Sequence, residues 1–208
     1  MTESSRTVFV VDDDASVREA IASLVRSVQL DVRTFDSAQE FLAADRPDVT
    51  ACLVLDVRLP GSSGLDLQRE LRARGVTVPI IFLTGYGDVP MTVRAMRAGA
   101  IEFLIKPFRD QDLLDAIQEG LRQSWAQRQE QAELAELRQR FDSLTPRERQ
   151  VMAEVVAGLP NKKIAAEFGT SEATVKLQRA QVMQKMRASS VAELVRLAAR
   201  LSSGRDTS

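Results

Sequence analysis

The sequence predicts a doubly wound α/β domain with a five-stranded parallel sheet, followed by an all-α domain of four helices. Over the first 120 residues, short apolar runs rich in β-branched residues alternate with amphipathic segments, as expected for strands that helices cover on both faces. After residue 142 only helical patterns occur, and 208 residues are enough for two domains. The five expected strands are Thr7–Val11, Asp31–Phe35, Ala51–Leu55, Pro79–Leu83 and Ile101–Ile105.

Short polar motifs indicate where helices begin between these strands. Ser16-x-x-Glu19 and Ser37-x-x-Glu40 both fit a capping box, in which two side chains accept hydrogen bonds from free backbone amides at the helix start. Strands joined by helices in this way imply right-handed crossovers and one open sheet. We therefore expect the first domain to span residues 1–122.

The segment from 110 to 141 contains no proline, one glycine and many strong helix formers, which predicts a helix whose part 123–141 links the two domains. Two stripes of mainly apolar residues run along it. The pattern is compatible with a solvated linker helix and with a short coiled-coil dimer seam. One stripe consists of Leu121, Trp125, Arg128, Ala132 and Ala135, and the other of Leu134, Leu137, Phe141 and Leu144.

The C-terminal domain, expected at residues 142–208, shows four helix starts and a tight turn before its third helix. This is the layout of a helix-turn-helix. Val175, Val182 and Met186 recur at helical spacing and are the expected buried stripe of the third helix. The four starts are marked by a Thr145-Pro-Arg-Glu capping box, by Asn161 as a cap, by Gly169-Thr-Ser and by Ser190-x-x-Glu193.

The composition excludes several activities. Without any histidine, the chain cannot hold a Ser-His-Asp triad, a histidine general base or a His-ligated zinc ion. It also lacks the GxxxxGK[ST] loop of P-loop ATPases. The net charge of −1 divides into −5 for residues 1–124, with 14 basic and 19 acidic residues, and +4 for residues 142–208, with 11 and 7. Solvated surfaces vary in this way, but the asymmetry also suits an acidic module joined to a nucleic-acid-binding one.

The apolar runs are too short to cross a membrane, and the N-terminus lacks the basic and apolar regions of a signal peptide. The single cysteine, Cys52, lies in an apolar run and can form no internal disulfide. We therefore expect a cytoplasmic protein with no membrane partner.

Chemically useful side chains follow four of the five expected strands. Asp12-Asp-Asp end the first strand, Asp56 ends the third, Thr84 follows the fourth and Lys106 follows the fifth. In an open parallel sheet these carboxyl ends meet at one edge. Converging carboxylates require a cation, and oxygen ligands suit Mg²⁺. The set predicts a site in which one aspartate becomes an acyl phosphate while Mg²⁺, lysine and threonine hold the phosphoryl oxygens.

Several segments resemble the receiver domain of two-component response regulators in the NarL/FixJ family. The resemblance covers about residues 6–122 and implies the CheY-like receiver fold. The residues from Thr84 to Met91, together with those from Ala95 to Ala100, are similar to the FixJ-like branch. The segments that carry the general resemblance are Val10-Val-Asp-Asp-Asp, Leu55-Asp-Val-Arg-Leu-Pro-Gly and Phe103-Leu-Ile-Lys-Pro-Phe.

Carried over by position, the resemblance implies that Asp56 is the phosphoacceptor and that Mg²⁺ is the cofactor. It makes Asp13 a direct ligand of the ion and Asp12 a supporting one. It also implies that Asp56 contacts the ion, together with the backbone carbonyl of Arg58.

The resemblance further implies that Thr84 and Lys106 bind the phosphoryl oxygens. Phe103 occupies the aromatic switch position, which turns inward as the threonine moves toward phosphate; the alternative is that Phe103 is a fixed core residue. The FixJ-like pattern usually has histidine at the position of Tyr86, which flanks the path of attacking water. We therefore expect a phosphorylated lifetime different from that of histidine-bearing relatives.

Residues 141–201 resemble LuxR-type helix-turn-helix domains. The resemblance implies that Lys176, Leu177 and Ala180 face base edges and that Arg179 and other basic residues bind phosphates. The family commonly has histidine at the position of Gln178, which leaves the target of this side chain open. The segments that carry the resemblance are Leu144-Thr-Pro-Arg-Glu-Arg-Gln-Val-Met, Gly158-x-x-Asn-Lys-x-Ile-Ala and Thr174-Val-Lys-x-x-Arg.

Helical geometry adds Gln181 to the exposed face of the third helix and Lys185 to its flank, where it is placed for a phosphate. A lysine in such a place is also common on a solvated face. The family resemblance implies a dimer contact through the last helix. The residues expected there are Val191, Leu194, Leu197 and Leu201.

The leading hypothesis is a transcriptional regulator, not an enzyme, that binds promoter DNA as a homodimer once a sensor histidine kinase has phosphorylated Asp56. A phosphohydrolase with the same aspartyl-phosphate chemistry is the enzymatic alternative. Arg58 argues against it, because phosphohydrolases with an Asp-x-Asp motif carry a second acid at this position. The third hypothesis is a signalling adaptor whose helical domain docks on proteins.

Overall fold

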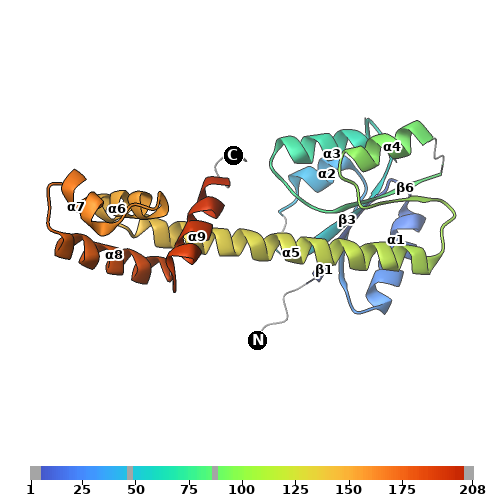
Figure 1. Ribbon diagram of the computed structural model, residues 1–208. Helices are drawn as coiled ribbons and strands as arrows, with labels where there is room; N and C mark the ends of the chain where they lie inside the picture. The colour runs from blue at the N-terminus through green and yellow to red at the C-terminus, as the bar shows by residue number, and fades with distance from the viewer. Residues whose placement is uncertain (1–5, 46–48, 86–88, 204–208) are drawn as a thin grey trace. The chain divides into compact units, whose positions relative to one another are not determined.

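The computed structural model describes residues 6–45, 49–85 and 89–203 (Figure 1). The chain divides into two compact units, Met1–Arg128 and Gln129–Ser208. Helix α5, Asp110–Asp142, contributes its first part to one unit and its second part to the other. The segment 123–141, which the sequence suggests as a linker, is therefore shared between the two units.

The first unit contains a five-stranded parallel sheet in the order β2-β1-β3-β6-β7. The five predicted strands are confirmed, with boundaries that shift by one residue at most. This order is that of doubly wound folds whose ligand site lies between the first and third strands of the chain, where neighbouring crossovers diverge. The strands are β1 Arg6–Val11, β2 Asp31–Phe35, β3 Thr50–Asp56, β6 Ile80–Thr84 and β7 Glu102–Ile105.

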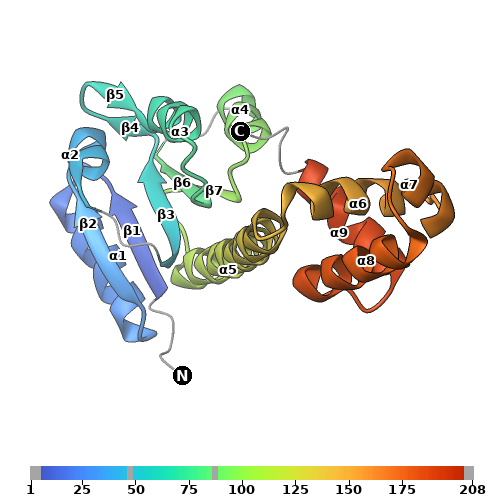
Figure 2. The same ribbon diagram turned by 90° about the vertical axis from the view of Figure 1, so that its left-hand side faces the viewer.

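Helices cover both faces of the sheet (Figures 1 and 2). One face packs against the short helix α2 and helices α3 and α4 through a core that includes Phe41 and Leu71. The other face packs against α1 and α5 through a core that includes Val25 and Ile117. The helices are α1 Ala15–Ser27, α2 Ala38–Ala43, α3 Gly64–Ala73 and α4 Val89–Arg97.

The helix starts in this unit differ in part from the predicted capping boxes. Ser37 caps α2 as expected, but Glu40 accepts a hydrogen bond from the backbone amide of Asp36 instead of that of Ser37. The predicted box at Ser16 is wrong, because Asp14 is the cap of α1. The Asp14 carboxylate accepts hydrogen bonds from the backbone amides of Ser16 and Val17. An aspartate two residues ahead of the serine competes for the same amides.

A two-stranded hairpin, β4 Arg58–Leu59 and β5 Ser62–Ser63, follows β3 directly. It was not expected from the sequence, because strands of two residues are too short to show any alternation of polar and apolar side chains. Gly61 has φ +79°, the left-handed conformation that the turn between β4 and β5 requires.

Helix α5 lies unusually close to the start of β3. A Cβ atom on Gly120 would lie only 2.9 Å from Cβ of Cys52, so glycine permits the approach. One helical turn later, the buried Ser124 hydroxyl accepts a hydrogen bond of 3.1 Å from the backbone amide of Ala51. This part of α5 is therefore attached to the same strand that carries Asp56 at its other end.

The second unit contains the four predicted helices, α6 Pro146–Val156, α7 Asn161–Glu167, α8 Glu172–Met186 and α9 Val191–Ser203. The capping box of Thr145 and Glu148, with proline at the first helical position, is confirmed. The three residues of the predicted buried stripe on α8 are all fully buried. The expected cap at Asn161 is wrong: Pro160 occupies the cap position, and Asn161 is the first residue of the helix.

The second apolar stripe of α5 belongs to the core of this unit. Leu137 and Leu144 are buried against α6, α8 and α9, and Phe141 packs beside them. These three side chains are therefore covered by their own unit, whereas Leu134 of the same stripe is only half-buried. In the first stripe, Leu121 is buried in the first unit, whereas Trp125 is 54% exposed.

Two of the expected dimer contacts must be corrected. Leu194 is fully buried and Leu201 is 9% exposed, because both side chains fill the core of the second unit. Such side chains are not available to a second copy. Among the larger apolar residues of α9, Val195 is 38% exposed, whereas Val191 and Leu197 are half-buried. In the described part of the chain, no helix is long and apolar enough to cross a membrane.

Candidate functional site

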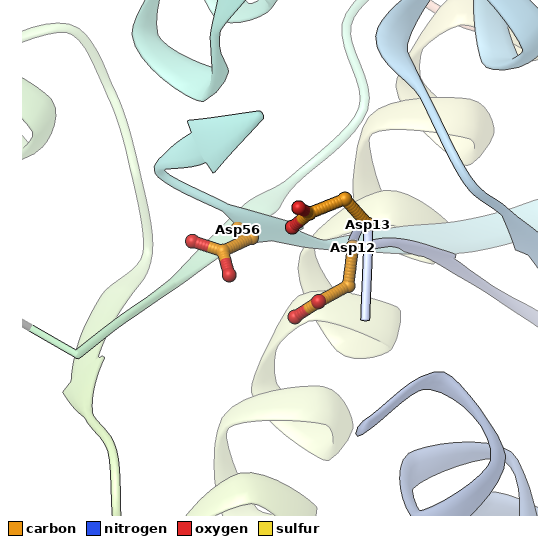
Figure 3. A group of neighbouring side chains, drawn as sticks. All are labelled: Asp12, Asp13 and Asp56. Atoms are coloured by element: carbon orange, nitrogen blue, oxygen red, sulfur yellow. The ribbon is translucent and has the colours of Figure 1, made fainter. Parts of the chain in front are cut away.

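Three carboxylates lie together at the carboxyl edge of the parallel sheet. Asp12 and Asp13 follow β1, and Asp56 is the last residue of the neighbouring strand β3 (Figure 3). One oxygen atom from each lies within 4.8 Å of the others. Asp12 and Asp56 are buried, whereas Asp13 is exposed. The convergence predicted from the strand ends is therefore present.

Lys106, which follows β7, joins this cluster. Its Nζ atom donates hydrogen bonds of 2.7 Å to Oδ2 of Asp12 and of 2.6 Å to Oδ2 of Asp56. Burial raises the pKa of Asp12, against the opposing effect of the lysine. For Lys106, burial lowers the pKa, but its hydrogen bonds to the two carboxylates outweigh burial, and its pKa is raised. The lysine therefore stays protonated.

The cluster fits a divalent cation. One ammonium group faces three carboxylates, so two of the negative charges have no counterpart within the cluster. The donors are oxygen atoms only, which suits Mg²⁺, and the exposed Asp13 leaves one side open to the water ligands that this ion retains. The residues present therefore fit the expected cofactor.

Backbone amides hold two of the carboxylates in place, and an arginine side chain holds the backbone of Asp12. The amide of Arg58 donates to Oδ1 of Asp56 at 2.9 Å, and the amide of Asp14 donates to Oδ1 of Asp12 at 3.0 Å. Arg18, which the sequence did not single out, donates from Nη1 to the backbone carbonyl of Asp12 at 2.7 Å. Arginine is common on helices, so nothing in the local pattern marks this one.

The other expected receiver residues lie on the neighbouring strands. Thr84 is the last residue of β6 and is fully buried; its carbonyl accepts a hydrogen bond of 2.7 Å from the amide of Lys106. Phe103 on β7 is half-buried, and its ring centroid lies 6.2 Å from that of Phe82. Tyr86 lies outside the described residues.

Gly64 is a site residue that the sequence analysis missed. A Cβ atom there would lie 2.3 Å from the backbone oxygen of Asp56. The signal is only a glycine in a glycine-rich turn, which does not reveal what approaches it. We expect Gly64→Ala to lower the free energy of unfolding of the first unit by about 2–3 kcal/mol, as overpacking does. Urea titration followed by the fluorescence of the single tryptophan measures this.

Gly85→Ala is the matched control for this prediction. None of the described residues has an atom within 4 Å of a Cβ atom on Gly85, and its φ is not in the left-handed region. An equal loss of stability in the two variants would contradict the assignment of close approach to Gly64.

Helix α8 presents the residues expected to read DNA. Lys176, Leu177, Ala180 and Gln181 are all exposed, and Leu177 is 62% exposed although it is apolar. They lie opposite the buried stripe of the helix. The structure therefore brings the predicted groove-facing residues onto one free surface.

Lys185, expected on the flank of this surface, is held by hydrogen bonds within the protein. Its Nζ atom donates to Oε2 of Glu148 at 2.6 Å and to the carbonyl of Ser143 at 3.3 Å. The Glu148 side chain is 6% exposed, so the lysine neutralises a buried carboxylate. Lys185 therefore has a structural role, because leaving Glu148 unpaired is costly, and its phosphate contact stays a prediction.

Gln178 lies on the side of α8 that faces the core. It is half-buried, and its enclosed Oε1 atom has no hydrogen-bond partner within the described part of the chain. The sequence leaves open what the Gln178 side chain contacts. Its Oε1 atom is enclosed by the protein and does not face a DNA groove.

A doubly wound domain with an aspartate–lysine cluster at its switch point, joined to a helix-turn-helix unit, defines the class of response regulators. The sequence models of two families match: the response regulator receiver domain over residues 8–118 and the bacterial regulatory proteins of the luxR family over residues 142–198. The chain belongs to the two-component response regulators with a LuxR-type DNA-binding domain, which are transcriptional regulators and not enzymes.

Relatives support this assignment over more than nine-tenths of the chain. Nodulation protein W of Bradyrhizobium diazoefficiens is 55% identical over 190 residues, 91% of this chain and 84% of that protein. Transcriptional regulatory protein FixJ of the same organism is 44% identical over 193 residues, which are 93% of this chain and 94% of that protein. Among solved structures, the response regulator StyR matches with a TM-score of 0.85 and 52% identity, covering 94% of this chain and 99% of that one.

Proposed function

We propose that Asp56 accepts a phosphoryl group from a partner sensor histidine kinase and that the phosphorylated chain binds promoter DNA as a homodimer. The observation that carries the proposal is the convergence of Asp12, Asp13, Asp56 and Lys106 at the edge shared by β1 and β3. The chain has no histidine of its own to carry a phosphoryl group, so the donor must be another molecule.

In the proposed step, one oxygen of the Asp56 carboxylate attacks the phosphorus of a phosphohistidine on the kinase. The P–N bond breaks, and the histidine nitrogen leaves with the electron pair and takes up a proton. Asp12, Asp13, Asp56 and the carbonyl of Arg58 would hold Mg²⁺, which supplies positive charge to the transferring oxygens when bound.

Lys106 is placed to exchange partners during this transfer. Its ammonium group now contacts Asp12 and Asp56, and a phosphoryl oxygen on Asp56 would attract it more strongly than the carboxylate does. The buried Thr84 would hydrogen-bond a second oxygen, and the half-buried Phe103 would fill the space that Thr84 vacates. These movements are the proposed switch.

The response would be read out on DNA by α8. Lys176 and Leu177 would contact base edges in the major groove, where an exposed leucine suits a thymine methyl group. Ala180 and Gln181 lie on the same surface, and Arg179 would bind a phosphate. Dimerisation would use the half-buried Val191 and Leu197 of α9. We expect all of this to take place in the cytoplasm.

The test is selection of bound DNA by the full-length protein with Mg²⁺, in the presence and absence of beryllofluoride as a phosphoryl mimic. We expect an enriched, two-fold symmetric sequence whose affinity rises with the mimic. The logarithm of affinity should fall with the logarithm of salt concentration, with a slope of about −0.9 for each phosphate neutralised. Absence of DNA binding under both conditions would favour the adaptor hypothesis.

A further inference from the structure

The side chain of Asn161 has a partner that its position at a helix start does not explain. Helix α7 begins after Pro160 without any side-chain cap, so the side-chain carboxamide of Asn161 does not cap the helix. Its Oδ1 atom instead accepts a hydrogen bond of 3.0 Å from Nη1 of Arg179, eighteen residues later on α8. The contact is partly buried, and Arg179 itself is half-buried.

The partner of Arg179 is neutral, in contrast to the partners of four other basic residues of the second unit. Arg149, Arg187, Arg200 and Lys185 each form an ion pair with a carboxylate. Within the described residues, no acidic side chain pairs with Arg179. A neutral acceptor fixes the direction of a guanidinium group without cancelling its charge.

The surroundings of this contact are also basic. Lys162 and Lys163 follow Asn161 directly and are exposed, and Lys176 lies one helical turn before Arg179 on α8. None of the three forms an ion pair among the residues that the structure describes. Positive charge without counter-ions beside a DNA-reading helix is what a phosphate contact requires.

We propose that Asn161 is a positioning residue for DNA binding: it holds the Arg179 guanidinium in the direction in which it meets a DNA phosphate. The inference rests on the proposed role of α8 in the major groove. A long side chain that is already ordered loses less freedom on binding, which corresponds to an about three- to tenfold gain in affinity. An aspartate at this position would order the arginine equally well but would neutralise it.

A double-mutant cycle on the full-length protein tests the coupling, with a duplex recovered from the DNA selection as probe. Asn161→Ala and Arg179→Ala are each expected to lower affinity, the former by about three- to tenfold. In the Arg179→Ala background, Asn161→Ala is expected to have no further effect, because the group that it positions is gone. Asn161→Asp should keep the contact yet reduce the magnitude of the salt slope by about one phosphate.

Gln150→Ala is the matched control. Oε1 of Gln150 accepts a hydrogen bond of 3.0 Å from Nη1 of Arg147, so the variant removes the same kind of contact at the same distance, but on α6. It is expected to leave DNA affinity unchanged. A loss equal to that of Asn161→Ala would show a general effect on the unit and would overturn the proposal.

A spectroscopic readout is independent of affinity. Asn161 is the only asparagine in the chain, so protein labelled with ¹⁵N-asparagine shows a single pair of side-chain amide signals. The pair is expected to shift in Arg179→Ala and again when the duplex is added to the wild type. If the wild type binds DNA and the affinity losses of Asn161→Ala and Arg179→Ala multiply in the double variant, this inference alone is overturned. If the wild type binds no DNA, the proposed function is overturned and the inference with it.

Discussion

Asp56→Asn is expected to abolish the increase in DNA affinity that beryllofluoride produces in the wild type. The mimic coordinates a carboxylate oxygen, and a carboxamide offers neither the negative charge nor a nucleophile for it. Basal affinity should stay within about twofold, because Asp56 lies in the first unit and the DNA-reading residues lie in the second. Fluorescence anisotropy of a labelled operator, with and without the mimic, measures both quantities.

Asp36→Asn provides the control for this result. Asp36 follows β2 at the same edge of the sheet but is exposed, and it lies outside the cluster of Asp12, Asp13 and Asp56. This variant should respond to the mimic as the wild type does. A normal response of Asp56→Asn would show that another carboxylate is the acceptor.

Glu148→Gln is expected to destabilise the second unit by about 2–3 kcal/mol, because it leaves Lys185 without its charged partner and weakens the capping box of α6. Hydrogen–deuterium exchange of α6 and α8 in the full-length protein measures the local free energy of opening. Glu154→Gln, on the same helix and without an ion pair among the described residues, should leave exchange unchanged.

The effect of Glu148 also has a predicted pH dependence. The hydrogen bond from Lys185, followed by that from the Thr145 amide, lowers the pKa of Glu148 below its ordinary value of 4.5. A carboxyl group with a lowered pKa in the folded state contributes stability above its unfolded pKa, and the contribution is lost as pH falls through the folded value. The difference between wild type and Glu148→Gln should therefore be full at neutral pH and disappear in acid. A difference that persists at pH 2 would contradict the role of the ion pair.

Much of the fold could be predicted because its signals are local. A buried parallel strand is a continuous apolar run, and the buried stripe of α8 recurs at helical spacing; both patterns follow from backbone geometry alone. The cluster of Asp12, Asp56 and Lys106 could be predicted for a related reason. Each residue ends a strand, and parallel strands bring their carboxyl ends to one edge.

The wrong caps at Ser16 and Asn161 reflect neighbouring residues, Asp14 and Pro160. The errors about apolar faces have another cause, the choice of partner by residues distant in the sequence. The amphipathic pattern of α9 shows that Leu194 is buried but not that the core of its own unit, instead of a second copy, buries it. The stripe through Leu137 and Phe141 on α5 has the same ambiguity. A hydrophobic pattern records that a face is covered and not what covers it.

The sequence by itself determined the carboxylate cluster of this response regulator, because strand ends place Asp12, Asp13 and Asp56 without any long-range choice of partner. Only the tertiary structure decided which basic groups near α8 remain available to DNA. Lys185 is engaged by a buried carboxylate, whereas Arg179 is held by a neutral amide that leaves its charge uncompensated. Both are equally basic in the sequence. Their difference arises because the cost of a buried charge depends on what the fold places beside it.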